Sequence, residues 1–99
     1  MIREVALLTI DPAKAAAFEA AVAEAAPLFR SAPGCDGMRL ERVVEAPGRY
    51  RLVVRWASVE AHVVDFRGSE AFAGWRALAG PFFTAPPEVD HGEEVAHYF

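Results

Sequence analysis

The side chains best suited to chemistry lie between Trp56 and His91. This stretch contains two tryptophans, two histidines and four phenylalanines. Large aromatic side chains with a small number of polar groups are typical of a ligand pocket, where aromatic surface holds a flat molecule and polar groups orient it. We therefore expect this stretch to line a pocket for a small aromatic molecule.

His62 is the first candidate catalytic residue. It falls near the start of a predicted helix, one turn before Phe66. An imidazole titrates near neutral pH and is well suited to act as a general base. The alternative is a histidine that packs on Phe66 and has one ring nitrogen bonded to the backbone.

His91 and Trp75 are the other two candidates for a catalytic role. His91 lies in a predicted strand, where it is either a second base or a partly exposed strand histidine. Trp75 either stacks on an aromatic ligand and donates its indole N–H, or packs in the core. The side chains predicted to bind the substrate are Trp56, Phe66, Phe72 and Phe82.

The motifs of several other chemistries are missing from the chain. No two histidines are spaced at i, i+4 or as H-x-H, and the single Cys35 allows neither a cysteine-rich metal site nor an internal disulfide. There is no G-x-S-x-G elbow, Walker loop or G-x-G-x-x-G segment. We therefore expect no metal and no bound cofactor.

Composition limits the partners and the size of the protein. The 99 residues are enough for a single domain over 1–99, and the net charge of −4 includes no Lys/Arg run, which argues against nucleic-acid binding. No segment reaches the ~20 apolar residues of a membrane span, and we expect a cytoplasmic protein. The apolar and aromatic share of 54% favours a homodimer that buries part of this surface.

The strands that must position the candidate residues follow from the hydrophobic pattern. Residues 2–10 form a predicted strand with apolar side chains on both faces, which indicates a strand covered on both sides. Strands over 36–45 and 49–56 form a hairpin, because Pro47-Gly48 suits the central positions of a type II turn. A last strand is predicted over 88–98.

Two helices separate these strands. Asp11 and Pro12 begin the first helix as its N-cap and first helical residue. Ser58 caps the second helix, which breaks at Gly68 and continues from Ser69. The predicted core stripe of the first helix consists of Phe18, Val22, Ala25 and Phe29.

The resulting order β-α-β-β-α-β predicts an α+β, ferredoxin-like fold with a four-stranded antiparallel sheet. Both helices are expected to cover one face of this sheet. Because these strands are apolar on both sides, a second subunit is expected to cover the other face by sheet-to-sheet packing.

Several short blocks together resemble one known family. The blocks are Pro33-Gly34, then Val54-Arg55-Trp56-Ala57-Ser58, then Glu60-Ala61-His62 with Phe66-Arg67, Ser69 and Trp75, and finally Val89-Asp90-His91. In order and spacing they resemble the antibiotic biosynthesis monooxygenase family of dimeric α/β-barrel proteins, over essentially the whole chain. The resemblance implies a homodimer with a pocket in each subunit, between the sheet and the second helix.

The same resemblance implies a function. It points to a small cofactor-independent monooxygenase that oxidises a phenolic or hydroquinone-type substrate with molecular oxygen. His62 would take the proton of the bound phenol, because a phenolate gives an electron to oxygen far more readily than a phenol. His91 or Trp75 would stabilise the oxygenated intermediate.

Two other functions remain open. The first is a non-catalytic dimer that binds a small molecule or serves in a stress response. The second is haem degradation, which is disfavoured. Haem-degrading relatives use an Asn in the first strand and an iron-binding His near the second helix, whereas this chain contains no Asn or Gln and has Trp75 roughly where that His falls.

Overall fold

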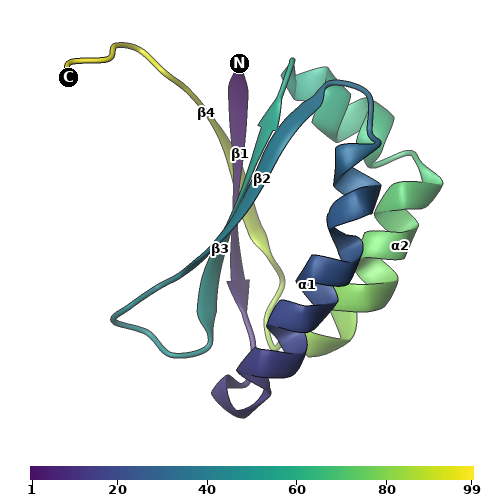
Figure 1. The fold of residues 1–99 in the computed structure, drawn as a ribbon, viewed down its shortest axis with the longest axis vertical. Coiled ribbons are helices and arrows are strands. Elements are labelled where there is room, and N and C mark those ends of the chain that lie inside the picture. Colours follow the sequence, from purple (N-terminus) through teal and green to yellow (C-terminus); the bar gives the residue numbers. More distant parts are fainter.

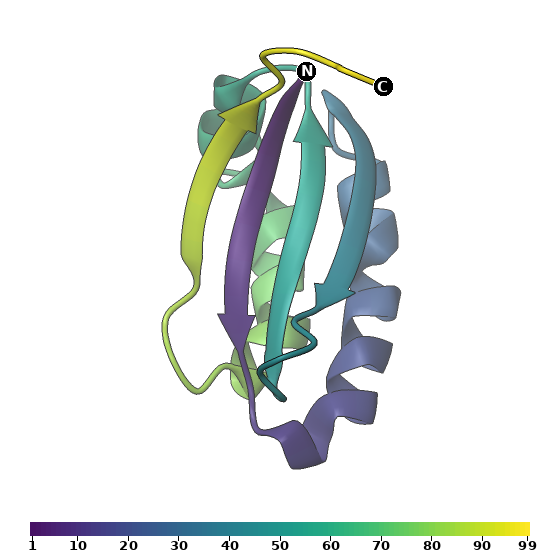
Figure 2. The ribbon, with the colours of Figure 1, turned by 90° about the vertical axis from the view of Figure 1, so that its left-hand side faces the viewer.

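The structure, a computed structural model that describes all of residues 1–99, has two layers (Figure 1). In chain order the elements are β1 (Ile2–Thr9), a 3₁₀ turn η1 (Pro12–Lys14), α1 (Ala15–Arg30), β2 (Cys35–Arg42), β3 (Arg49–Trp56), a π-helix η2 (Ala61–Phe66), α2 (Glu70–Ala79), a 3₁₀ turn η3 (Gly80–Phe82) and β4 (Glu88–Glu93). The antiparallel sheet has the order β2-β3-β1-β4, and the helices lie behind it in Figure 2. The predicted ferredoxin-like α+β fold is confirmed.

The first helix begins where its capping residue predicts. The Asp11 carboxylate accepts a hydrogen bond from the Ala13 N–H at 2.9 Å, and a short 3₁₀ turn leads into α1. Pro27 lies inside the helix, which still continues to Arg30. The four residues of the predicted stripe are the buried residues of α1: Phe18, Val22, Ala25 and Phe29.

The hairpin between β2 and β3 turns as a type II turn. Gly48 has a φ of +83°, which the third position of such a turn requires, and the Arg49 N–H donates to the Ala46 carbonyl at 3.0 Å. The Gly48 carbonyl also accepts a hydrogen bond from the Ile10 N–H at 2.8 Å. The turn therefore ties the hairpin to the end of β1.

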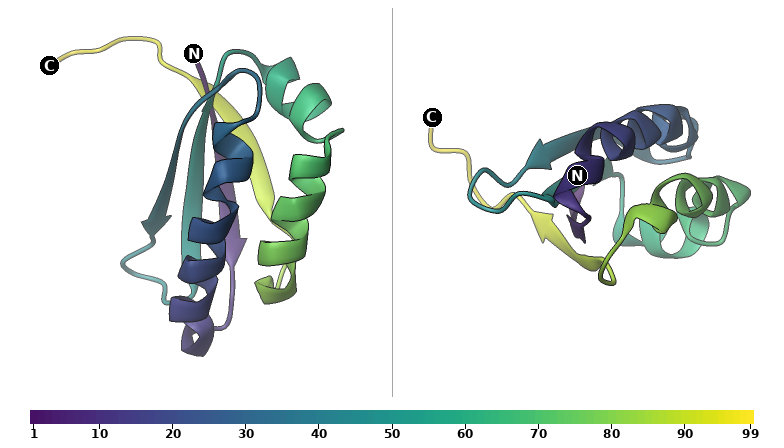
Figure 3. Two further views of the ribbon diagram at one scale, coloured as in Figure 1. Left: turned by 45° about the vertical axis from the view of Figure 1, so that its right-hand side comes forward. Right: turned by 90° about the horizontal axis from the view of Figure 1, so that it is seen from below.

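The core lies between the sheet and the two helices, which Figure 3 shows side by side on one face. Along β3, alternate residues turn toward the helices and are buried: Tyr50, Leu52, Val54 and Trp56. Glu4, in the neighbouring strand β1, pairs with Val54, so this carboxylate also lies on the buried face. The sheet thus carries an acidic group into an otherwise apolar layer.

The last strand is shorter than the predicted 88–98. It ends at Glu93, which pairs with Ile2 at the start of β1, so the sheet has almost no residues left with which a longer strand could pair. Residues 94–99 leave the sheet and extend away from the helices in Figure 1. Three of their large side chains, Val95, Tyr98 and Phe99, are exposed.

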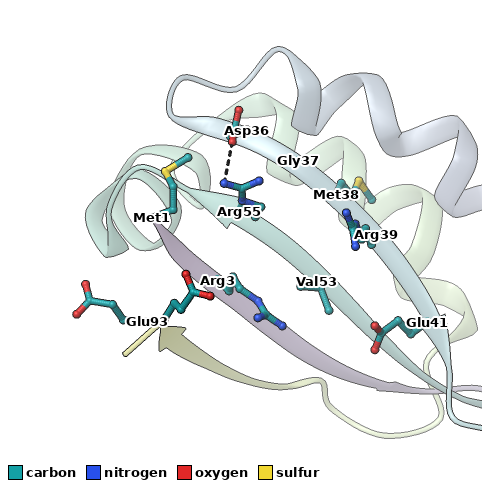
Figure 4. A pocket seen from close by; sticks show the side chains of 11 residues that line it. Met1, Arg3, Asp36, Gly37, Met38, Arg39, Glu41, Val53, Arg55 and Glu93 are labelled. Atoms are coloured by element: carbon teal, nitrogen blue, oxygen red, sulfur yellow. Dashed lines mark ion pairs between the residues drawn. The ribbon is translucent and has the colours of Figure 1, made fainter. Parts of the chain in front are cut away.

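The open face of the sheet is more charged than expected. Val5, Leu7 and Val53 lie on this face, and Val43 and Met1 are near them, but charged side chains surround this apolar patch. In β3 the residues that alternate with the buried ones are mostly arginines, so the prediction that all four strands are apolar on both sides is wrong. Figure 4 shows the charged side chains over part of this face, among them Arg3, Asp36, Arg39, Glu41 and Arg55, with Asp36 and Arg55 paired at 3.3 Å.

Neither main helix has the combination of length and apolar character that crossing a membrane would demand.

Candidate active site

A π-helix places His62. The Ser58 hydroxyl accepts the Ala61 N–H at 3.1 Å, as expected of a helix cap, but from Ala61 the helix widens. The Arg67 N–H donates to the His62 carbonyl five residues earlier, at 3.1 Å. Short π-helical segments are rare and occur often at functional sites. Nothing in the apolar spacing of this stretch distinguishes it from an ordinary α-helix.

Four side chains from three strands and the π-helix meet behind the sheet. The indole N–H of Trp56 donates to Glu4 Oε1 at 3.0 Å, and His62 Nε2 lies 3.2 Å from the same oxygen. His62 Nδ1 lies 2.8 Å from Nε2 of His91, and the Trp56 and His62 rings are stacked with centroids 5.3 Å apart. Trp56, His62 and Glu4 are only 0%, 3% and 5% exposed, whereas His91 is half-buried, so His91 is the member of the network nearest to solvent.

Burial raises the pKa of Glu4 and lowers the pKa of His62. Loss of solvation raises the pKa of the Glu4 carboxyl above its usual 4.5, although the Trp56 hydrogen bond and the Arg67 charge act in the other direction. Loss of solvation, with the charges of Arg67 and His91, lowers the pKa of His62 to about 4. At pH 7 the imidazole is therefore neutral and carries one N–H.

The neighbours of His62 favour one position for that proton. An N–H on Nε2 faces the Glu4 carboxylate, and Nδ1 is then free to accept a hydrogen bond from His91 Nε2–H. Glu4 Oε1 receives the Trp56 N–H, whereas Oε2 has no hydrogen-bond partner in the protein. The site thus holds a carboxylate with raised proton affinity next to a neutral imidazole.

Glu4 and His62 form part of the wall of a cavity of about 620 Å³ between the sheet and α2. Its other polar side chains are Arg67 and Arg76. Its apolar wall is formed by Ala6, Leu8, Leu52, Phe72, Trp75, Phe83 and Val89. A cavity of this size, apolar with a few convergent polar groups, fits a small aromatic molecule.

Some of the predicted wall residues line this cavity and others do not. Trp75 and Phe72 do. Trp56 is fully buried against Glu4 and His62, and Phe66 packs among Phe29, Trp56 and Phe72 in the core. Phe82 packs edge-on against Phe18, and its neighbour Phe83 lines the cavity instead.

The three predicted catalytic residues lie in one region. His62 and His91 are in direct contact, and Trp75 lines the same cavity as His62. Glu4 was not singled out from the sequence, although alternation along β1 gives it the same face as Ala6 and Leu8. A carboxylate on the buried face of a strand was the signal that could have found it. No group of three or more histidine, cysteine or acidic side chains is arranged to hold a metal ion.

Comparison with known proteins places this chain in one family. Residues 1–78 match the family described as antibiotic biosynthesis monooxygenase, and the chain belongs to it. Proteins of this family are typically dimers. The resemblance inferred from the sequence is thereby confirmed.

Individual relatives cover nearly the whole chain. A crystal structure from Bordetella bronchiseptica, provisionally named an antibiotic biosynthesis monooxygenase, is 49% identical, with 96% of this chain and 97% of that chain covered and a TM-score of 0.93. The uncharacterised protein YczJ of Bacillus subtilis (strain 168) is 36% identical over 96% of this chain and 100% of its own length. A mutant of SnoaB from Streptomyces nogalater, a cofactor-independent oxygenase, shares the fold at 19% identity, with 97% and 94% covered and a TM-score of 0.78.

Proposed function

We propose that the protein is a cofactor-independent monooxygenase that oxidises a phenolic or hydroquinone-type substrate with molecular oxygen. The observation that carries the proposal is the Glu4–His62 pair in the wall of an aromatic cavity. Membership of the monooxygenase family and the shared fold of SnoaB, a cofactor-independent oxygenase, support it.

The Glu4–His62 pair is the proposed base. Burial raises the pKa of Glu4, which narrows the gap between its proton affinity and that of a phenol. Trp56 and His62 hold Oε1, and this leaves Oε2 for the substrate hydroxyl. His91 is half-buried at the edge strand β4 and contacts Nδ1 of His62, so it is suited to exchange the proton with solvent.

The chemistry that follows needs no further group from the protein. The phenolate transfers one electron to O2, and the phenoxyl radical combines with superoxide at a ring carbon to form a peroxide. The pair returns its proton to the distal peroxide oxygen and then removes the hydrogen of that ring carbon. Cleavage of the O–O bond leaves a quinone that holds one atom of O2, while the other atom leaves as water.

The aromatic wall supports this sequence of steps. Phe72, Trp75 and Phe83 offer flat apolar surface to the ring of a substrate, and the indole of Trp75 can stabilise an oxygenated intermediate. Apolar side chains around the ring reduce its contact with water, which favours radical recombination over side reactions.

We propose a homodimer formed through the open face of the sheet. Val5, Leu7 and Val53 supply a small apolar centre, and arginines and carboxylates surround it. A two-fold contact allows the arginines of one subunit to meet the carboxylates of the other. Sedimentation at low and high salt tests this. A dimer weakened by salt is expected, whereas a monomer at micromolar concentration contradicts the proposal.

Oxygen uptake with a panel of hydroquinones and hydroxynaphthalenes tests the activity. Wild-type protein is expected to consume oxygen with at least one member, and Glu4→Gln to be slower by about 10²–10⁴-fold, the usual contribution of a general base. Glu24→Gln, which removes an exposed carboxylate of α1 outside the cavity, is the matched control and is expected to keep the wild-type rate.

Binding measurements with the same panel, and addition of haem, distinguish the proposed oxygenase from the two other functions. Tight binding of an aromatic compound without oxygen uptake would indicate sequestration and overturn the proposal. A stoichiometric Soret band on addition of haem, together with haem loss, would indicate haem degradation.

A further inference from the structure

Two arginines line the cavity without a carboxylate partner. Arg67 follows the π-helix, and Arg76 lies in α2. The ion pairs of the protein are Arg42–Glu19 and Arg55–Asp36, and the Glu4 carboxylate faces the neutral imidazole of His62. Both cavity arginines are therefore free to pair with a ligand.

Both arginines are exposed side chains at the border of the site. The Arg67 backbone N–H is bonded to the His62 carbonyl. The Arg67 charge contributes to the lowered pKa of His62 and opposes the rise in the pKa of Glu4 that burial causes. The Arg76 guanidinium lies 6.0 Å from the centre of the Phe72 ring, at the outer limit of a cation–π contact. One arginine thus acts on the acid–base pair, and the other lies over the aromatic wall.

The charge of the cavity is opposite to that of the whole protein. The chain has 14 acidic against 10 basic side chains, whereas the cavity has two arginines against the single carboxylate of Glu4. An apolar wall strengthens electrostatic attraction, because it keeps high-dielectric water away. The planar guanidinium group matches a carboxylate with two parallel hydrogen bonds.

We propose that the substrate is an aromatic acid, a phenol whose ring also carries a carboxylate. The ring lies against Phe72 and Trp75, the hydroxyl meets Glu4, and the carboxylate meets Arg67 and Arg76. Repulsion between the substrate carboxylate and Glu4 disfavours the reversed orientation. The inference rests on the proposed function for the identity of the site and adds the class of substrate.

Calorimetric binding of two non-phenolic probes tests the inference without turnover. 2-Naphthoate carries the carboxylate, and 2-naphthamide is its neutral analogue of nearly the same shape. We expect 2-naphthoate to bind about tenfold more tightly, as for a charge-assisted contact at a partly exposed site. Raising the salt concentration to about 1 M is expected to narrow the difference, because it screens exposed charges.

Substitutions test whether the two arginines cause the preference for 2-naphthoate over 2-naphthamide. Arg67→Gln and Arg76→Gln are each expected to reduce the preference for 2-naphthoate several-fold, and the double variant to abolish it. Arg30→Gln, an exposed arginine in the last turn of α1 and away from the cavity, is the matched control and is expected to keep the full preference. All three positions are exposed, so the variants are expected to fold.

The outcomes of this experiment are distinct from those of the oxygen-uptake experiment. Equal affinity for the two probes, no saturable binding of either, or a preference that survives in the double variant overturns the inference. If a neutral hydroquinone is oxidised while the probes bind equally, the proposed function stands and the inference fails. If the arginine-dependent preference appears but no phenol is oxidised, the cavity still takes aromatic acids and the proposed function fails.

Discussion

Replacement of Glu4 by leucine tests the buried network most sharply. Leucine has nearly the same volume as glutamate but cannot accept a hydrogen bond. It would leave the Trp56 N–H, now 3.0 Å from its acceptor, without a partner in a fully buried position. His62 Nε2, 3.2 Å from the same oxygen, would lose its acidic neighbour.

The expected cost follows from these two contacts. An unpaired buried donor costs about 1–3 kcal/mol, so two of them cost about 2–6 kcal/mol. Relief from burying the carboxylate offsets part of this sum, and we expect Glu4→Leu to lose about 2–4 kcal/mol of unfolding free energy. Glu4→Gln keeps an acceptor for Trp56 and removes the buried charge, so it is expected to remain within about 1 kcal/mol of wild type.

Urea unfolding at one fixed protein concentration measures both variants, with circular dichroism as the probe. Trp56→Phe removes the indole donor, so in that background the cost of Glu4→Leu is expected to fall by about 1–3 kcal/mol. If Glu4→Leu is as stable as Glu4→Gln, the proposed role of Glu4 as the acceptor of this network is refuted.

Three further experiments test other parts of the account. In a Glu4→Gln background, acidification from pH 7 to pH 5 is expected to cost about 2 kcal/mol of unfolding free energy and to cost far less when His62 is also replaced by Gln. The pKa of His62 is about 4 in the folded protein, below its usual 6.5, so between pH 7 and pH 5 the unfolded chain binds the proton more readily than the folded protein. Urea titrations at the two pH values measure this loss of stability. Gly48→Ala is expected to lose about 1–3 kcal/mol in thermal unfolding, since a Cβ there would clash with the Ile10 carbonyl oxygen and φ is +83°; an unchanged Tm would contradict this. Gly74→Val is expected to lose about 1–3 kcal/mol by the same assay, because its Cβ would lie 2.9 Å from Leu28 Cδ1 and its branches would overfill the contact between α1 and α2, whereas Gly74→Ala should cost less.

Local rules were enough to predict most of the fold. The stripe from Phe18 to Phe29, the Asp11 cap and the turn at Gly48 each depend on neighbours in the sequence, and each is confirmed. The end of β4 depends on where its partner β1 begins. The hydrophobic periodicity of residues 88–98 carries no information on that point. For that reason its length was overestimated.

The candidate site was predicted in part. Aromatic composition pointed to a cavity beside the second helix, and His62, His91 and Trp75 do lie in that region. Glu4 was overlooked because its partners are far along the chain: His62 comes from the π-helix and Trp56 from β3. The same limit applies to Arg67 and Arg76, which as isolated arginines on a helix look like ordinary surface charges.

Labelling with ¹⁸O2 tests the central claim most directly. The wild-type protein is incubated with an oxidisable phenol under labelled oxygen, and the product is reduced at once so that its oxygen does not exchange with water. Mass spectrometry is expected to find one labelled atom in each product molecule made by the wild type, and almost no labelled product from Glu4→Gln in the same time. Product that carries no label, or full labelling by Glu4→Gln at the wild-type rate, would contradict oxygen insertion assisted by the Glu4–His62 pair.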